Sequence, residues 1–143
     1  MKDRFVLLVE DNPDDVALTL RALKRNHISN EVIVATDGVE ALDFLFCRGA
    51  YARRDPHSLP ELILLDLRLP KVDGIEVLRQ VRADQRTQSL PIVILTSSNR
   101  DRDMVDSLHY GANAYIQKPV EFDPFVAAIR ELGLYLMVLK EAV

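Results

Sequence analysis

The sequence predicts an α/β fold in which helices cover both faces of a doubly wound, five-stranded parallel sheet, and three observations support it. Short runs of unbroken aliphatic residues, such as Leu62–Leu65, lack the alternation of a half-exposed strand and are typical of strands buried on both faces. Segments of helical periodicity alternate with these runs. The length of 143 residues suits a single domain over residues 1–143, with a core over about residues 4–131 and a C-terminal helix end over residues 132–143.

Composition and charge exclude several classes of protein. Hydrophobic content of 48% and charged content of 28% are ordinary for a soluble globular domain. The formal charge of −4, with no basic run longer than Arg53-Arg54, argues against a nucleic-acid partner. The N-terminal residues form neither a signal peptide nor a membrane anchor, so the cytoplasm is the expected location. The single Cys47 cannot form an internal disulfide, and its apolar neighbours predict a small buried side chain.

The first half of the chain is predicted to form two strands, each followed by a helix. Residues 4–9 are an apolar run that ends in Glu10 and Asp11, and the next helix has Asp14 and Asp15 at its positive N-terminal end. Residues 31–35 form a second strand rich in β-branched residues. The inward positions predicted for the two helices are Val16, Leu20, Leu23 and His27 in the first, and Val39, Leu42 and Phe46 in the second, which ends near Gly49.

The second half repeats the pattern after a long polar loop over residues 49–59, whose length suggests an interaction surface. The third strand ends at Asp66, and Gly74 predicts a tight or positive-φ corner before the third helix. The remaining predicted elements are a helix with Ile75, Val77, Leu78 and Val81 inward, a strand over residues 92–95, a polar helix over about residues 100–110, a strand over residues 114–117 and a last helix over about residues 122–140.

Polar side chains follow four of the five predicted strands. They are Glu10 and Asp11, then Asp66, Thr96 and Lys118. In the strand order 2-1-3-4-5 the first and third strands flank the point where the order reverses, so all of these residues reach one edge of the sheet. Crowded carboxylates stay ionised only if a cation neutralises them, and a small set of oxygen ligands favours Mg²⁺.

Asp66 is the natural nucleophile of this group. Carboxylates form aspartyl-phosphate intermediates, while Lys118 and Thr96 offer a charge and a hydroxyl to phosphoryl oxygens. Each residue alone has a plainer interpretation, because an aspartate after a strand often caps a turn, a threonine there caps a helix and a Lys-Pro pair forms a turn. The coincidence of all five at one sheet edge favours the phosphoryl-transfer site.

Four motifs in order resemble the receiver domain of two-component response regulators, which has a CheY-like, flavodoxin-like fold. The motifs are LLVEDN at Leu7–Asn12, LILLDLRLPKVDG at Leu62–Gly74, ILTSS at Ile94–Ser98 and YIQKP at Tyr115–Pro119. The resemblance covers essentially the whole chain. It implies that Asp66 accepts a phosphoryl group from a histidine of a sensor histidine kinase. Because the last predicted helix takes up the remaining chain, we expect output to pass through protein contacts.

The resemblance also implies a role for each matching residue. Asp11 and Asp66 would bind Mg²⁺ through their side chains, Glu10 through water and Arg68 through its backbone carbonyl. Thr96 and Lys118 would contact the phosphoryl group, and Tyr115 would be the switch aromatic that rotates inward with Thr96. Arg68 and Ser98 occupy positions that govern hydrolysis, where a bulky Arg68 is expected to slow the attack of water. The Lys118-Pro119 bond is often cis in such proteins, with a trans turn as the alternative.

The C-terminal sequence suggests a partner and an assembly. The ending RELGLYLMVLKE and the loop over residues 49–59 resemble stand-alone regulators paired with phytochrome-type kinases. One inward stripe of the last helix would be Phe125 or Val126, Ile129, Leu132, Leu136 and Leu139, yet other residues there are apolar too. We therefore expect a homodimer through Leu134, Tyr135, Met137 and Val138, with a helix folded onto its own domain as the alternative.

Two competing functions use the same fold features. A phosphatase of the dehalogenase type also has a nucleophilic aspartate after a strand, but it needs a second acid two residues on, where Arg68 stands. A pure interaction module that is not phosphorylated would not require the intact set of Glu10, Asp11, Asp66, Thr96 and Lys118. Nucleotide binding is disfavoured, since no glycine-rich phosphate loop occurs. The expected protein is therefore no enzyme beyond promoting its own Mg²⁺-dependent phosphorylation and dephosphorylation.

Overall fold

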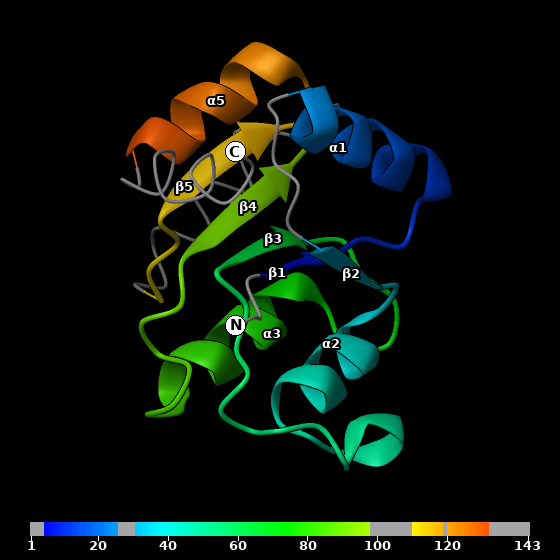
Figure 1. Ribbon diagram of the computed structural model, residues 1–143, viewed down its shortest axis with the longest axis vertical. Coiled ribbons are helices and arrows are strands. Elements are labelled where there is room, and N and C mark those ends of the chain that lie inside the picture. Colours follow the sequence, from blue (N-terminus) through cyan, green and yellow to red (C-terminus); the bar gives the residue numbers. More distant parts are fainter. Residues whose placement is uncertain (1–4, 26–30, 98–109, 119, 132–143) are drawn as a thin grey trace.

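The computed structural model describes residues 5–25, 31–97, 110–118 and 120–131, and it confirms the predicted fold class. A parallel sheet of order β2-β1-β3-β4-β5 forms the middle layer (Figure 1). The strands are β1 Phe5–Val9, β2 Glu31–Ala35, β3 Leu62–Asp66, β4 Ile92–Thr96 and β5 Ala114–Gln117. The described helices are α1 Pro13–Arg25, α2 Gly38–Leu45, α3 Gly74–Ala83 and α5 Phe122–Glu131, with a short 3-10 turn η1 at Gly49–Tyr51.

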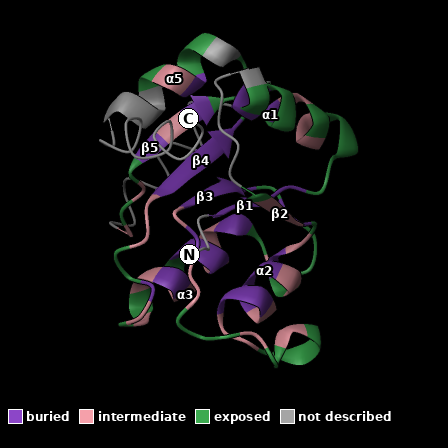
Figure 2. Ribbon diagram, in the orientation of Figure 1, coloured by how far each residue is buried: buried purple, intermediate pink, exposed green. Residues whose placement is uncertain are grey.

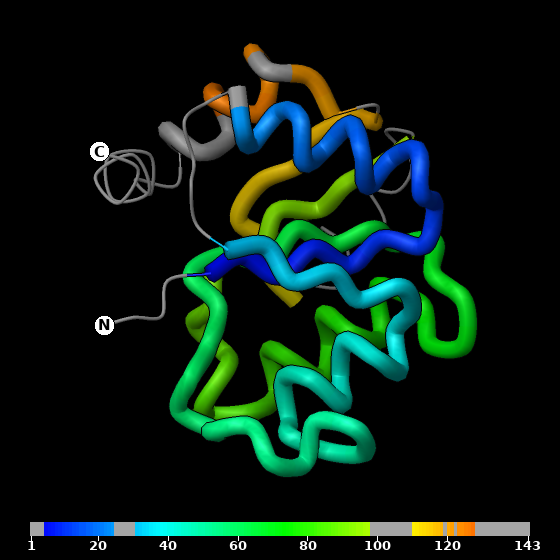
Figure 3. The backbone as a smooth tube through the Cα atoms, turned by 45° about the vertical axis from the view of Figure 1, so that its right-hand side comes forward, coloured from blue at the N-terminus to red at the C-terminus, as the bar shows by residue number. Residues whose placement is uncertain are grey.

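Helices cover both faces of the sheet, α1 and α5 on one side and α2 and α3 on the other (Figures 1 and 3). Alternate residues of each strand therefore enter different cores: Leu7 and Leu65 face α2 and α3, whereas Leu8 and Leu64 face α1 and α5. The central strands are buried along their whole length (Figure 2). Burial of each such leucine contributes about 1.5–3 kcal/mol, so the strand ends rest on a rigid support.

Aspartates begin two of the helices. Asp37 Oδ1 accepts a hydrogen bond from the Glu40 backbone N–H at 2.7 Å, and Asp73 Oδ1 accepts one from the Glu76 N–H at 3.0 Å. Each contact satisfies a donor that the helix leaves unpaired, which is worth about 1 kcal/mol. The capping roles of Asp37 and Asp73 are findings of the structure.

Several predicted details are corrected. Leu20 and Val39 are exposed, because the buried faces of α1 and α2 are rotated toward residues such as Leu23 and Ala41. Helix α2 ends at Leu45 rather than near Gly49. Cys47 is half-buried rather than buried, at a backbone φ of 55° just beyond that helix.

The loop before β3 is attached to α2 through aromatic contacts. The guanidinium carbon of Arg54 lies 3.7 Å from the centre of the Phe44 ring, and Arg54 Nη2 donates to the Ser58 carbonyl at 2.6 Å. The Tyr51 hydroxyl donates to Glu40 Oε2 at 2.8 Å. These contacts give the long loop a defined shape against the helix.

Some predictions fall outside the described residues. These concern His27, the helix expected over about residues 100–110, Ser98, the Lys118-Pro119 bond and the apolar residues beyond 131. Within the ranges that the structure describes, no helix has the length and apolar character needed to cross a membrane.

Candidate functional site

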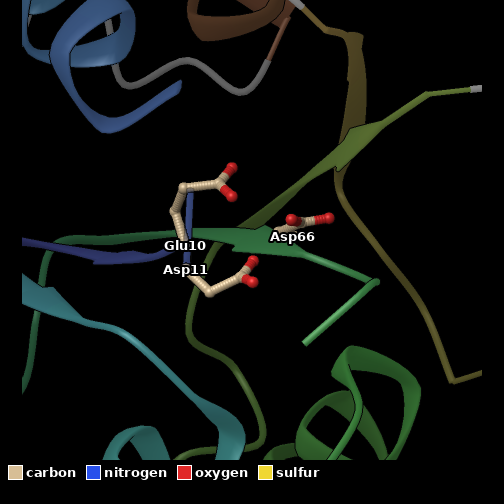
Figure 4. Close-up of side chains that lie close together, drawn as sticks. All are labelled: Glu10, Asp11 and Asp66. Atoms are coloured by element: carbon tan, nitrogen blue, oxygen red, sulfur yellow. The ribbon is translucent and has the colours of Figure 1, made fainter. Parts of the chain in front are cut away.

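Three carboxylates meet where β1 and β3 end. Glu10 and Asp11 directly follow β1, Asp66 is the last residue of β3, and the two strands are hydrogen-bonded neighbours. One oxygen from each carboxylate lies within 4.8 Å of the others (Figure 4). Glu10 and Asp66 are buried, whereas Asp11 is exposed. The structure therefore brings together the three acidic residues that the sequence placed at this edge.

Backbone hydrogen bonds hold the two buried acids. The Glu10 N–H donates to the Ala35 carbonyl of β2 at 2.9 Å, and Glu10 Oε2 accepts from the Asn12 N–H at 3.2 Å. Asp66 Oδ1 accepts from the Arg68 N–H at 3.0 Å. Both carboxylates are thus fixed by elements that cannot move without disturbing the sheet.

The loop after β3 is wedged against the backbone that carries Asp66. Gly74 opens α3 and donates its N–H to the Leu67 carbonyl at 2.9 Å. The φ angle of Gly74 is not positive, so the glycine is explained by close approach instead: a Cβ there would lie 2.3 Å from the Asp66 carbonyl oxygen. Lys71 has a φ of 68°, and its Nζ lies 3.4 Å from Asp37 Oδ2. The loop is thereby tied to α2 as well.

Lys118 reaches the acids from the end of β5. Its backbone N–H donates to the Thr96 carbonyl at 2.7 Å, which continues the pairing of β4 and β5. Its Nζ lies 3.0 Å from Glu10 Oε1, 3.1 Å from Asp66 Oδ2 and 2.9 Å from Asp15 Oδ2. The predicted convergence of Lys118 on Asp66 is present in the structure.

Asp15 was missed as a member of this group. The sequence suggested only that it suits the positive end of α1, yet the structure places its carboxylate on Lys118. Its position in the first turn of a helix that starts at the same sheet edge is the signal that could have identified it.

The cluster has more acidic than basic side chains, and their contacts shift the pKa values of Glu10 and Lys118. Burial raises the pKa of Glu10 to about 7; contacts with Lys118 and the Asn12 N–H oppose this rise, and the neighbouring Asp66 adds to it. Burial alone would lower the pKa of Lys118, but its contacts with Asp15, Glu10 and Asp66 outweigh burial and raise it. Lys118 is therefore a permanent positive charge, and it is outnumbered by the carboxylates that surround it.

The cluster fits a divalent cation. Glu10 Oε1 is fully buried and has no hydrogen-bond partner among the described residues, although Lys118 Nζ is at ion-pair distance. Such an oxygen, together with those of Asp11 and Asp66, forms the hard oxygen donor set that Mg²⁺ and Mn²⁺ prefer. A cation there would reduce the repulsion among the three carboxylates and would give the buried Glu10 Oε1 a further partner.

Thr96 and Tyr115 lie on the neighbouring strands. Thr96 ends β4 and is buried, and Leu95 before it pairs with Asp66 in the sheet register. Tyr115 lies in β5, half-buried, against the core that faces α2 and α3. Arg68 is exposed beside Asp66. The predicted dimer residues Leu134, Tyr135, Met137 and Val138 lie outside the described residues.

A family model and similar solved structures all point to response regulators. A family model described as the response regulator receiver domain matches residues 6–130. The solved structure of the bacteriophytochrome response regulator RtBRR is 52% identical with a TM-score of 0.88, covering 92% of this chain and 79% of that one. The structure of the bacteriophytochrome response regulator AtBRR is 50% identical with a TM-score of 0.86, covering 93% and 94%.

A cyanobacterial protein is also similar. Response regulator Rcp1 of Synechocystis sp. is 39% identical over 115 residues, which are 80% of this chain and 76% of Rcp1. A solved structure of the Mn²⁺-bound form of Rcp1 is 34% identical with a TM-score of 0.73, covering 96% of this chain and 95% of that one.

Proposed function

This chain belongs to the response regulator receiver domain family, and we propose that Asp66 is the residue on which it accepts a phosphoryl group from a histidine of a sensor kinase. The observation that carries this proposal is the placement of buried Asp66 between an acidic cation site and the Lys118 ammonium, 3.1 Å from Asp66 Oδ2. A nucleophile, a cation site and a fixed positive charge are the parts that phosphoryl transfer needs.

In the proposed transfer, an Asp66 carboxylate oxygen forms a bond to phosphorus while the phosphorus–nitrogen bond of the donor phosphohistidine breaks. The histidine ring keeps that electron pair and takes a proton from solvent water. Lys118 and the Thr96 hydroxyl stabilise charge on the phosphoryl oxygens. The Arg68 N–H holds Asp66 Oδ1, which orients the other carboxylate oxygen for attack.

We propose Mg²⁺ as the cation. Asp11 and Asp66 would bind it through their side chains, Glu10 through water and Arg68 through its backbone carbonyl. When bound, the ion neutralises the clustered carboxylates and the incoming phosphoryl oxygens. The oxygen donor set and the fully buried Glu10 Oε1, which has an ion-pair contact with Lys118 but no hydrogen bond among the described residues, support this assignment, as does the Mn²⁺-bound form of the similar Rcp1.

The output is a change of surface rather than turnover of a substrate. A phosphoryl group adds about −1.5 to −2 charges at one point. Thr96, drawn to these charges, would free space for Tyr115 to rotate inward from β5, and the population would shift between two packings. The protein then promotes only its own phosphorylation and dephosphorylation, in the cytoplasm, and signals through protein contacts.

The central test is labelling with acetyl phosphate in Mg²⁺, followed by intact-mass spectrometry. Wild-type protein should gain one phosphoryl group and Asp66→Asn none. Lys118→Ala should still be labelled, but the change of surface that follows phosphorylation should be weaker. Phosphate incorporation into Asp66→Asn at the wild-type level would refute the assignment. Turnover of a phosphate monoester would favour a phosphatase instead, and an unlabelled wild-type protein would favour a pure interaction module.

The proposed phosphodonor is a phytochrome-type histidine kinase, supported by the similarity to RtBRR and AtBRR. Phosphotransfer profiling tests this by incubating the protein with each purified, autophosphorylated kinase of its host. The fastest transfer should come from a phytochrome-type kinase. Preferential transfer from a kinase of another sensor type would overturn the partner assignment without affecting Asp66.

We also propose a homodimer through Leu134, Tyr135, Met137 and Val138, from the nearly all-round apolar sequence there. Light scattering at tens of micromolar, with and without acetyl phosphate, measures the assembly directly. A monomeric mass under both conditions would rule the dimer out and would favour a helix that folds onto its own domain.

A further inference from the structure

Lys118 is held by a carboxylate that lies outside the acidic cation site. Asp15 Oδ2 approaches Lys118 Nζ at 2.9 Å, the shortest of the three ion-pair distances of this ammonium. The Asp15 side chain is 23% exposed and that of Lys118 16%, so the pair is largely removed from water. A contact of this kind is stronger than an ion pair between fully exposed side chains.

Helix α1 fixes the position of Asp15. Asn12 caps the helix, since its Oδ1 accepts hydrogen bonds from the N–H groups of Asp14 at 2.8 Å and Asp15 at 3.3 Å. The Asp15 carbonyl accepts a hydrogen bond from the hydroxyl of the fully buried Thr19 at 2.9 Å. The carboxylate that meets Lys118 is therefore presented by a capped and anchored first turn.

The three partners of Lys118 differ in what else they must do. Glu10 and Asp66 belong to the cluster that can hold a cation, and Asp66 is the proposed acceptor of the phosphoryl group. Asp15 has neither task. During the proposed transfer, Asp66 exchanges its contact with Lys118 for a bond to phosphorus, and Glu10 also serves the cation site. Of the three partners, Asp15 is the one that neither the transfer nor the cation engages.

We propose that Asp15 is a positioning residue for the phosphoryl-transfer reaction, which holds the Lys118 ammonium in place while Asp66 and Glu10 change partners. This inference rests on the proposed function of Asp66. An ammonium has three N–H donors on a long flexible side chain, and one donor anchored by Asp15 leaves the others directed at the phosphoryl oxygens. Without that anchor, Lys118 samples more orientations and stabilises the developing charge less often.

The test is the initial rate of phosphorylation by acetyl phosphate in saturating Mg²⁺, measured on the full chain. Asp15→Ala should slow the rate about 10-fold, a loss typical of residues that orient a group in contact with the reaction. Asp14→Ala is the matched control, since Asp14 lies in the same helical turn, carries the same charge and is exposed. Its rate should match wild type, and equal rates for Asp14→Ala and Asp15→Ala would overturn the inference.

A double-mutant cycle with Lys118 separates positioning from a general effect on the fold. In a Lys118→Ala background, Asp15→Ala should change the rate by less than about 2-fold, because the group that it positions is gone. If Asp15→Ala still lowered the phosphorylation rate about 10-fold in the Lys118→Ala background, the proposal would be contradicted.

Asp15→Asn keeps the side-chain shape and an acceptor oxygen, so it should recover part of the rate lost in Asp15→Ala; no recovery would also count against it. Thermal unfolding of each variant shows that the protein compared is folded. If wild-type protein were not phosphorylated at all, the function proposed for Asp66 would fail, which differs from a phosphorylated wild type that is insensitive to Asp15.

Discussion

Gly74 at the start of α3 lies against the backbone of Asp66 so closely that a side chain cannot fit. A Cβ at position 74 would lie 2.3 Å from the Asp66 carbonyl oxygen and 2.5 Å from Leu67 Cα. Backbone atoms cannot move aside as a flexible side chain can. The proposed nucleophile is thereby positioned by the absence of a side chain eight residues further along the chain.

Gly74→Ala is therefore expected to affect both stability and phosphorylation. It should lower the free energy of unfolding by about 1–3 kcal/mol, the usual cost of overpacking, and slow labelling of Asp66 because the strand end must shift. Urea unfolding and acetyl phosphate labelling measure the two effects. Gly49→Ala is the control: it strains a residue with φ of 55° remote from Asp66 and should cost stability alone. Labelling of Gly74→Ala at the wild-type rate would show that Asp66 tolerates the shift.

Asp11→Asn is expected to weaken binding of Mg²⁺ or Mn²⁺ by at least about 10-fold, because it removes the charge of a proposed oxygen ligand on the exposed side of the cluster. Isothermal titration calorimetry measures the affinity without any phosphodonor. Asp14→Asn makes the same charge change at a nearby exposed position and should bind as wild type does. Removal of divalent cations with a chelator should also abolish labelling of the wild-type protein. Unchanged affinity in Asp11→Asn would place the ion elsewhere.

Asp37 should make the stability of the protein depend on pH. Hydrogen bonding from the Glu40 N–H, together with the nearby Lys71, lowers the pKa of Asp37 below its ordinary value of 3.8, although burial opposes this. Because the folded pKa is depressed, the stabilisation is complete above the unfolded value and is lost as pH falls through the folded one. Asparagine still caps the helix but lacks the charge, so Asp37→Asn should cost up to about 1 kcal/mol at pH 7 and less at pH 3.

Urea unfolding of wild type and Asp37→Asn at the two pH values measures this difference. Glu121→Gln, at an exposed position, controls for the loss of one negative charge. A difference between wild type and Asp37→Asn that stayed constant from pH 7 to pH 3 would show that the charged form of Asp37 does not stabilise the helix.

Arg68→Ala is expected to shorten the lifetime of the phosphorylated protein several-fold. The exposed Arg68 side chain stands two residues after Asp66, where it would restrict the approach of water to the phosphoryl group. The decay of phosphorylated protein after removal of acetyl phosphate measures the lifetime. Arg68→Lys, which keeps length and charge, should decay nearly as wild type does. A lifetime unchanged in Arg68→Ala would exclude shielding by this residue.

Local patterns in the sequence predicted the five strands and the polar residues that gather at one edge of the sheet. The unbroken apolar runs at β1, β3 and β4 are buried in full, since a strand covered on both faces needs apolar residues at every position. Glu10, Asp11, Asp66, Thr96 and Lys118 follow such runs, so their convergence follows once the strands are parallel. Helical periodicity was less informative, because a partly apolar helix leaves its exact rotation open, as the exposed Leu20 and Val39 illustrate.

From local pattern alone, an aspartate was predicted to end the third strand, at the sheet edge that other polar strand ends share. How that carboxylate is held became visible in the folded chain: the Arg68 N–H donates to it, Gly74 packs against its backbone, and Lys118, which Asp15 also contacts, lies beside it. These relationships depend on distances between segments far apart in the chain, which no local pattern encodes. A residue type predicts what a side chain can do, whereas packing fixes which partner it meets.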